Sequence, residues 1–202
     1  MDKWFKDASF FLVLMASDLI SYYVSLTLSY FTRLMLNPIL KEEFVFTFPL
    51  LHFLSMWWMT LVFIFFLFYE GLYTKRYTFP EDLRRLFKIV FLSIASVFFL
   101  VGITKKSEEV SRLMILMLGI YMYPVITFLR YLSKKLLFKW GFGVKRFIVI
   151  GIDGIVQKAA SFLDSERMLG YRLMGFFSDR DTFKRLSVNG RSFVVRRLKS
   201  VD

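Results

Sequence analysis

Four long runs of apolar residues dominate the first two thirds of this 202-residue chain and restrict how it can fold. They cover residues 8–30, 46–69, 86–104 and 113–129. A helix needs about 20 consecutive apolar residues to cross a bilayer, and each run is near that length. The hydrophobic fraction of 56% also exceeds the roughly 45–50% that is typical of soluble domains. We therefore predict four transmembrane helices in direct contact with the lipid bilayer.

The basic residues that flank these runs predict the orientation of the helices. One side of the membrane would receive the larger set, namely Lys3, Lys6, Lys75, Arg76, Arg84, Arg85, Lys88, Arg130, Lys134, Lys135, Lys139, Lys145 and Arg146. The other side would receive Arg33, Lys41, Lys105, Lys106 and Arg112. Because the side that is richer in Lys and Arg is normally cytoplasmic, we expect both termini inside the cell. Membrane topology and anionic headgroups then account for the net charge of +12, and we expect no nucleic-acid partner.

One carboxylate lies within the predicted spans. Asp18 is about ten residues into the first run, roughly 15 Å deep, and Ser96 in the third run is expected at a matching depth. Two interpretations stand: a polar site for a lipid headgroup or a proton, and an interhelical hydrogen bond from a neutral or paired Asp18. We favour the second, because we expect no other carboxylate, Lys or Arg within the membrane beside it.

Residue types that support several kinds of chemistry are scarce. The chain has no Cys and a single His, His52. A disulfide framework, a thiolate or histidine metal site and a Ser-His-Asp triad are therefore not expected. We assign no catalytic residue and no metal ligand.

The pattern changes after a basic connector at residues 134–144. A strand at 145–151, a helix at 155–162 and strands at 171–177 and 191–196 are predicted, which resembles the opening of a Rossmann-like unit. We therefore divide the chain into a four-helix transmembrane domain (1–133), the connector (134–144) and an incomplete Rossmann-like cytoplasmic domain (145–202).

The turn after the first of these strands carries the candidate cofactor-binding residues. A full G-x-G-x-x-G motif would place Gly at 151, 153 and 156, but the chain has Gly151, Asp153 and Val156, with Gly154 out of register. Gly151 and Gly154, with Asp179 after the second strand, are the residues that would contact a nucleotide, a sugar nucleotide or CoA. Asp153 places a negative charge where a phosphate would lie, so the predicted site is degenerate.

Two segments carry a resemblance to a known family. Glu70-Gly71-Leu72-Tyr73, followed by Asp82-Leu83-Arg84-Arg85-Leu86, and the later Leu169-Gly170-Tyr171-Arg172 resemble the polyprenyl-phosphate (undecaprenyl-phosphate) hexose-1-phosphate transferases of bacteria. These enzymes begin exopolysaccharide, capsule or O-antigen repeat units. The resemblance implies a location in the bacterial inner membrane, a polyprenyl-phosphate partner and a central nucleotide- or CoA-binding-like domain. Asp18 is similar to an acid commonly found in the family's first span.

The family's chemistry resides in a C-terminal domain with an Asp-Glu pair, and no such domain precedes Asp202 here. We therefore expect this chain to be the membrane-anchoring and accessory part of such a transferase, inactive alone and served by a separate catalytic chain. The alternatives are a non-catalytic membrane regulator that recruits glycan-assembly proteins, a nucleotide or CoA sensor, and the N-terminal part of a membrane-bound nucleotide-sugar dehydratase/epimerase.

Overall fold

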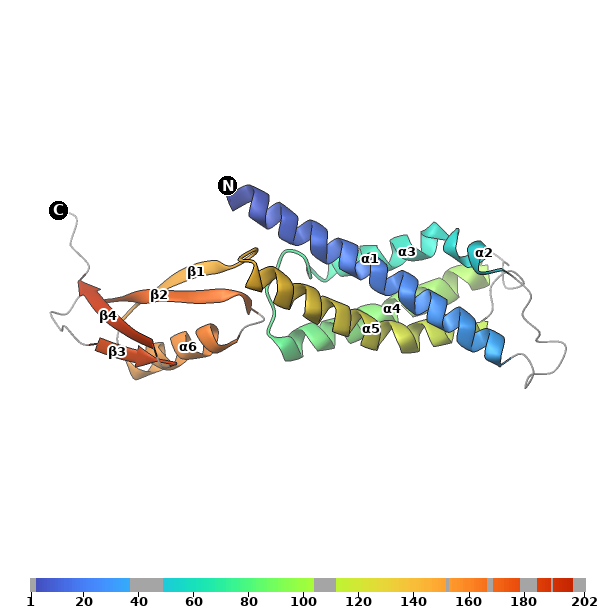
Figure 1. Cartoon of the computed structure of the whole chain (residues 1–202). Helices are drawn as coiled ribbons and strands as arrows, with labels where there is room; N and C mark the ends of the chain where they lie inside the picture. The colour runs from blue at the N-terminus through green and yellow to red at the C-terminus, as the bar shows by residue number, and fades with distance from the viewer. Residues whose placement is uncertain are drawn as a thin grey trace. The chain divides into compact units, whose positions relative to one another are not determined.

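The computed structural model describes residues 3–36, 49–103, 112–151, 153–166, 169–178, 185–189 and 191–197 (Figure 1). The chain divides into two compact units. One is helical and comprises Ala8–Lys134, and the other comprises Met1–Asp7 with Lys135–Asp202 and contains the strands. Each unit is described by itself below.

The helical unit is built from α1 (Lys3–Met35), α2 (Leu50–Leu54), α3 (Trp57–Tyr69), α4 (Phe79–Ile103) and α5 (Arg112–Lys139). Three segments are long and apolar enough to cross a membrane: Asp7–Met35, Phe79–Ile103 and Arg112–Lys139. Helix α3 is apolar but has only 13 residues. The structure therefore supports a membrane protein with three candidate spans in its described residues.

The second predicted span is interrupted. Ser55 Oγ donates a hydrogen bond to the carbonyl of His52 at 2.7 Å, and Met56 leaves helical geometry with φ −79° and ψ 60°. The amide of Trp57 then bonds to the carbonyl of Ser55 at 2.9 Å. A serine side chain that bonds locally to the backbone competes with helix propagation, which explains the break between α2 and α3. Residues 46–48 of the predicted span lie outside the described residues.

The sequence of residues 78–82 predicts a helix start with acidic residues in the first turn, and α4 does begin there; the predicted span was the later, apolar part. The run was placed at 86–104, but α4 begins at Phe79, where the amide of Asp82 bonds to the carbonyl of Thr78 at 2.9 Å. The charged turn before the apolar run and the span itself are therefore one continuous helix. In the same way, α5 continues for ten residues beyond the predicted end at 129.

The core of the helical unit combines apolar residues with a polar face of α1. Buried apolar side chains come from every helix of the unit, for example Leu26, Phe53, Phe63, Ile89 and Ile126. The buried face of α1 also carries a series of small polar residues four positions apart: Ser17, Ser21, Ser25 and Ser29. Small residues let helix backbones approach closely. Ser29 Oγ accordingly reaches the carbonyl of Met114 on α5 at 3.1 Å.

Large aromatic side chains point outward from the helices. Phe65, Phe87, Phe91, Phe99 and Phe128 are each at least 60% exposed. Such a surface suits lipid, which is as apolar as the interior of the unit. Because lipid supplies no hydrophobic force between helices, packing and polar contacts must set the helix arrangement.

The second unit contains β1 (Lys145–Ile150), α6 (Gly154–Ser165), β2 (Tyr171–Ser178), β3 (Arg185–Val188) and β4 (Arg191–Arg197). The strand order is β1-β2-β4-β3. β1 and β2 are parallel, as are β2 and β4, whereas β3 and β4 form an antiparallel pair. The predicted strand-helix-strand unit is therefore present, and β3 was not predicted.

Candidate functional site

Asp18 lies in a buried ion pair rather than alone. On α1 it is 0% exposed, and its Oδ2 accepts hydrogen bonds from Arg130 Nη1 at 2.9 Å and from the Tyr73 hydroxyl at 2.8 Å. The side chains of Asp18 and Arg130 are each 1% exposed. The expectation that no basic residue accompanies Asp18 was therefore wrong, whereas the interhelical hydrogen bond is present.

Arg130 was not predicted as a partner of Asp18, because it lies just beyond the predicted end of the fourth span at residue 129. Helix α5 instead runs on to Lys139, which keeps Arg130 on the buried face. The spacing of the residues in α5 does indicate that Arg130 is buried. Four buried residues follow one another at intervals of four: Met122, Ile126, Arg130 and Lys134. Leu14, Asp18, Tyr22 and Leu26 form the matching series on α1. Residues four apart share a helix face, so Asp18 and Arg130 belong to the packing faces of α1 and α5.

Arg130 also holds the loop that joins α3 to α4. Its Nη2 donates to the carbonyl of Leu72 at 2.9 Å, and its guanidinium lies 5.4 Å from the centre of the Tyr73 ring. Burial, and then the neighbouring Asp18 carboxylate, raise the pKa of the Tyr73 phenol above its usual value. Tyr73 therefore remains a hydrogen-bond donor at physiological pH.

A second buried ion pair extends the site to α4. Lys134 Nζ lies 2.5 Å from Asp82 Oδ2, and these side chains are 10% and 11% exposed. Ser133 Oγ and Ser17 Oγ are hydrogen-bonded at 2.9 Å. Two carboxylates thus face two cations, so the cluster carries no net charge. We call Asp18, Tyr73, Asp82, Arg130 and Lys134 the charge cluster.

The contacts of the charge cluster change the expected depth of Asp18. Its partner Tyr73 belongs to the α3–α4 loop, and Asp82 is in the first turn of α4. Asp18 is therefore level with the loop end of the unit, not with the middle of the spans. Helix α1 makes this possible because it begins before the apolar run and has 33 residues, about 50 Å.

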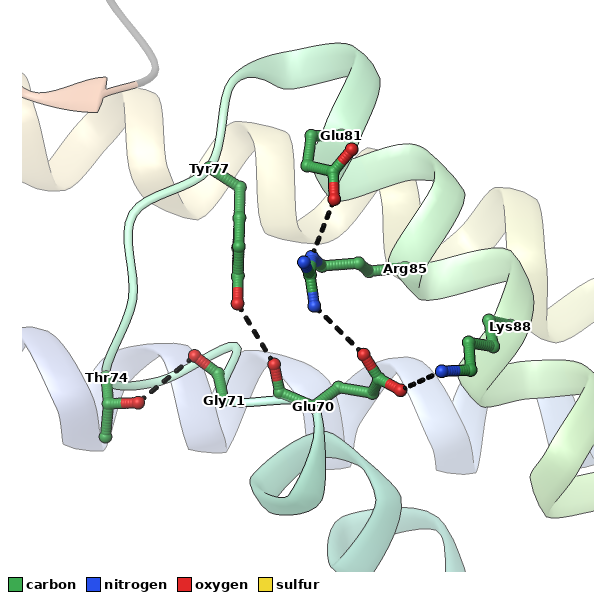
Figure 2. A network of polar contacts seen from close by, with 7 residues as sticks. All are labelled: Glu70, Gly71, Thr74, Tyr77, Glu81, Arg85 and Lys88. Atoms are coloured by element: carbon green, nitrogen blue, oxygen red, sulfur yellow. Dashed lines mark hydrogen bonds and ion pairs between the residues drawn. The ribbon is translucent and has the colours of Figure 1, made fainter.

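A second network lies at the same end and centres on Glu70 (Figure 2). The Glu70 carboxylate, only 7% exposed, contacts Arg85 Nη1 at 3.0 Å and Lys88 Nζ at 2.5 Å. Arg85 Nε also pairs with Glu81 at 2.9 Å, and its guanidinium stacks 4.0 Å from the centre of the Tyr77 ring. The Tyr77 hydroxyl donates to the carbonyl of Glu70 at 3.2 Å. We call this set the Glu70 network.

The charge cluster is suited to hold helices together and less suited to catalysis. Its cations are already paired with its carboxylates, which leaves little charge for a substrate. Asp18 Oδ1, Asp82 Oδ1 and Arg130 Nε are buried without a hydrogen-bond partner among the described residues. Among the residues that the structure describes, no group of three His, Asp or Glu side chains lies close enough together to hold a metal ion.

Ser96 does not join Asp18 in the way that its predicted depth suggested. It is half-buried on α4, whereas Ser93, three residues earlier, is the buried serine of that helix. The atoms that reach the Asp18 carboxylate come from Tyr73 and Arg130. The matching depth was predicted from the distance of each residue to the start of its apolar run. Both helices begin before those runs, at Lys3 and at Phe79, so this distance does not give the depth.

The glycine turn of the α/β unit has the expected backbone but an exposed acid. Gly151 has φ +115°, and its amide donates to the carbonyl of Phe177 at 2.8 Å. Gly154 begins α6, and Asp153 is the exposed N-cap, without a capping bond from its side chain. Asp179, the third predicted cofactor-binding residue, lies outside the described residues.

Comparisons of the chain with protein-family models and with curated proteins find no match.

Proposed function

We propose that this chain is the membrane-anchoring and accessory part of a polyprenyl-phosphate sugar-1-phosphate transferase system, which begins a bacterial surface polysaccharide. The observation that carries the proposal is the placement of the segment from Glu70 to Tyr73. In the first of the two segments that carry the family resemblance, Glu70, Leu72 and Tyr73 are the residues that fix this loop. Tyr73 bonds to α1, Leu72 to α5, and Glu70 to two cations of α4.

The proposal includes a fourth membrane crossing formed by α2 and α3 together. From Leu50 to Tyr69 they provide 20 residues, about 30 Å if mainly helical, which matches the hydrocarbon layer. At the break the exposed Ser55 side chain donates a hydrogen bond to a freed backbone carbonyl, and serine bonds of this kind help a broken helix to cross a membrane. With four crossings, both termini lie on the same side of the bacterial inner membrane, which we propose is the cytoplasmic side. The basic residues near the α3–α4 loop support that orientation.

The α/β unit would serve as a Rossmann-like module on the cytoplasmic side. Its parallel strands follow the order β1-β2-β4, which is the order of one half of a Rossmann sheet. The antiparallel β3 takes the place of a second crossover helix. Asp153 at the start of α6 would repel a phosphate, so we do not extend the proposal to a nucleotide or CoA sensor. Sugar transfer itself is assigned to no residue described above.

The experiment measures the first lipid-linked sugar in membranes of the organism that encodes the chain. A strain without the gene and a strain that again expresses the full chain are supplied with radiolabelled sugar nucleotide. We expect deletion to lower the labelled polyprenyl-diphosphate sugar and the wild-type chain to restore it. Asp18→Asn should restore less, because it leaves the buried Arg130 without its counterion.

A matched control is Asp153→Asn, which makes the same chemical change at an exposed carboxylate. It should restore labelling as well as wild type. Unchanged labelling in the deletion strain would refute the proposed function. Normal labelling together with the loss of a co-purifying glycosyltransferase would favour the non-catalytic regulator instead.

A further inference from the structure

The sheet of the α/β unit is covered on one face by α6. Ala160 of α6 is buried against Leu173 and Phe176 of β2, and Phe147 and Val149 of β1 pack on the same cluster. Side chains alternate between the two faces of a strand. Arg146, Ile148 and Ile150 of β1 therefore lie on the opposite face, where Ile148 is 56% and Ile150 is 65% exposed.

Strand β2 continues this opposite face. In the parallel register Arg172 is the partner of Arg146, Gly175 of Ile148 and Phe177 of Ile150. The register shift between Phe147 and Ile148 leaves Met174 in a bulge, 51% exposed. We call Arg146, Ile148, Ile150, Arg172 and Met174 the open face. Parallel strands are normally covered on both faces, so the open face is the kind of surface that takes a cover.

The charges of the open face restrict what that cover is. Arg146 and Arg172 are exposed register partners on adjacent strands, which are about 4.8 Å apart. Like charges directly opposite each other are unfavourable in a sheet. Neither arginine forms an ion pair within the described part of the chain. A suitable cover therefore brings negative charge to the arginine pair and apolar groups to the isoleucines.

The link between α5 and the sheet is short. Helix α5 has 28 residues, about 42 Å, which equals the thickness of a bilayer with its headgroups. It stops sharply, because the amide of Phe142 bonds to the carbonyl of Leu137 at 2.9 Å while Gly141 adopts φ +77°. Five residues then lead to Lys145, a link that spans at most about 20 Å.

We infer that the open face docks on the anionic surface of the membrane that the helices cross. Arg146 and Arg172 bind lipid phosphates, and Ile148, Ile150 and Met174 enter the boundary between headgroups and acyl chains. A bilayer supplies both kinds of partner at once and is always within reach of the link. The open face of a second copy of the chain would bring apolar groups but no carboxylate to the arginine pair. The inference needs the chain to be a membrane protein, but it does not rest on the proposed transferase function.

The test uses the full chain, whose lack of cysteine allows single reactive sites to be introduced. Ile148→Cys reports on the open face, and Lys158→Cys on exposed α6 is the matched control. Each variant carries an environment-sensitive NBD label and is reconstituted, one chain per disc, in nanodiscs. The discs contain phosphatidylcholine alone or mixed with phosphatidylglycerol, with or without spin-labelled lipid as a quencher.

We expect lipid quenching at position 148 and not at 158, and only in discs that contain phosphatidylglycerol. High salt should reduce it, because headgroup attraction is screened. Arg146→Gln and Arg172→Gln should each lower the docked-to-undocked ratio about fivefold, the effect of one basic residue near an anionic surface.

Three results would overturn the inference. Position 148 and position 158 could be quenched equally, or quenching at 148 could be the same without phosphatidylglycerol. The third is a label that stays water-exposed in every lipid but becomes shielded when a second chain is added to the disc. That result would assign the open face to a copy of the chain. Loss of transferase-related labelling in cells leaves all three readouts unaffected, so the two proposals fail separately.

Discussion

Removal of either charge from the Asp18–Arg130 pair should strongly destabilise the helical unit. Both side chains are 1% exposed, and one Asp18 oxygen accepts from both Arg130 and Tyr73. Breaking a buried ion pair by removing one partner costs about 3–5 kcal/mol, because the other charge stays buried without compensation. Arg130→Gln also weakens the bond to the Leu72 carbonyl that holds the loop. For a chain of this size such a loss corresponds to a fall in Tm of about 10 °C.

The double variant separates the interaction from the loss of each residue. Asp18→Asn with Arg130→Gln keeps the approximate shape of both side chains and leaves no buried net charge. Its cost should be well below the sum of the two single variants, with a coupling energy of about 2–3 kcal/mol. Unfolding of the purified chain by SDS in mixed micelles, followed by tryptophan fluorescence, measures all four free energies.

Arg112→Gln is the matched control, because Arg112 begins the same helix but is exposed. We expect a change below about 0.5 kcal/mol for this variant. Single variants whose costs add within about 0.5 kcal/mol would contradict the predicted coupling, since independent sites behave in that way. An equal loss of stability in Arg112→Gln and Arg130→Gln would contradict it as well.

Three further predictions concern the loop between α3 and α4. Tyr73→Phe removes a hydrogen bond to the buried Asp18 carboxylate and should lower the free energy of unfolding by about 1.5–3 kcal/mol. Its control is Tyr69→Phe, at a side chain that is 72% exposed, which should cost almost nothing in the same SDS titration. Gly71→Ala should destabilise by about 1–2 kcal/mol because Gly71 has φ +69°, while Gly102→Ala, in helical backbone with open space around it, should raise Tm slightly. Glu70→Gln should cost about 1 kcal/mol, and the difference should shrink in high salt, because its partner Lys88 is 57% exposed; a larger loss that is insensitive to salt would contradict this.

The sequence predicted the helices better than it predicted their ends. Apolar runs identified α1, α4 and α5, because the 18–20-residue apolar requirement of a bilayer is a property of composition. The break at Ser55 depends instead on one side-chain bond to a carbonyl, which no count of apolar residues detects. The helix start at the charged first turn of α4 was predicted, but its continuity with the apolar span was not. A charge ends an apolar run in the sequence, but it does not end a helix.

The site shows the same difference between composition and geometry. Asp18 stands out in the sequence because a carboxylate in an apolar run is costly, but its partner is not part of any apolar run. Arg130 lies one residue beyond the predicted fourth run and is 1% exposed. Arg130 is buried because α5 continues beyond the run, so that Met122, Ile126 and Arg130 share one face. A periodicity of four is thus more informative than the boundary of a run when a buried charge needs a partner.

The buried polar contacts select the arrangement of the helices. Lipid and helix interior are equally apolar, so insertion of the helices does not determine which helix packs against which. The charge cluster determines which helices pack together, because only few arrangements pair all of its charges: Asp18 on α1, Asp82 on α4 and the two cations on α5. Variants of the charge cluster should therefore still insert into membranes in normal amounts and lose helix arrangement first. Disulfide formation between cysteines introduced at Ser29 and Met114, which are in contact across α1 and α5, reports that arrangement directly. It should decrease in Asp18→Asn and stay unchanged in Arg112→Gln. Reduced insertion with unchanged cross-linking would mean that the cluster serves insertion and not packing.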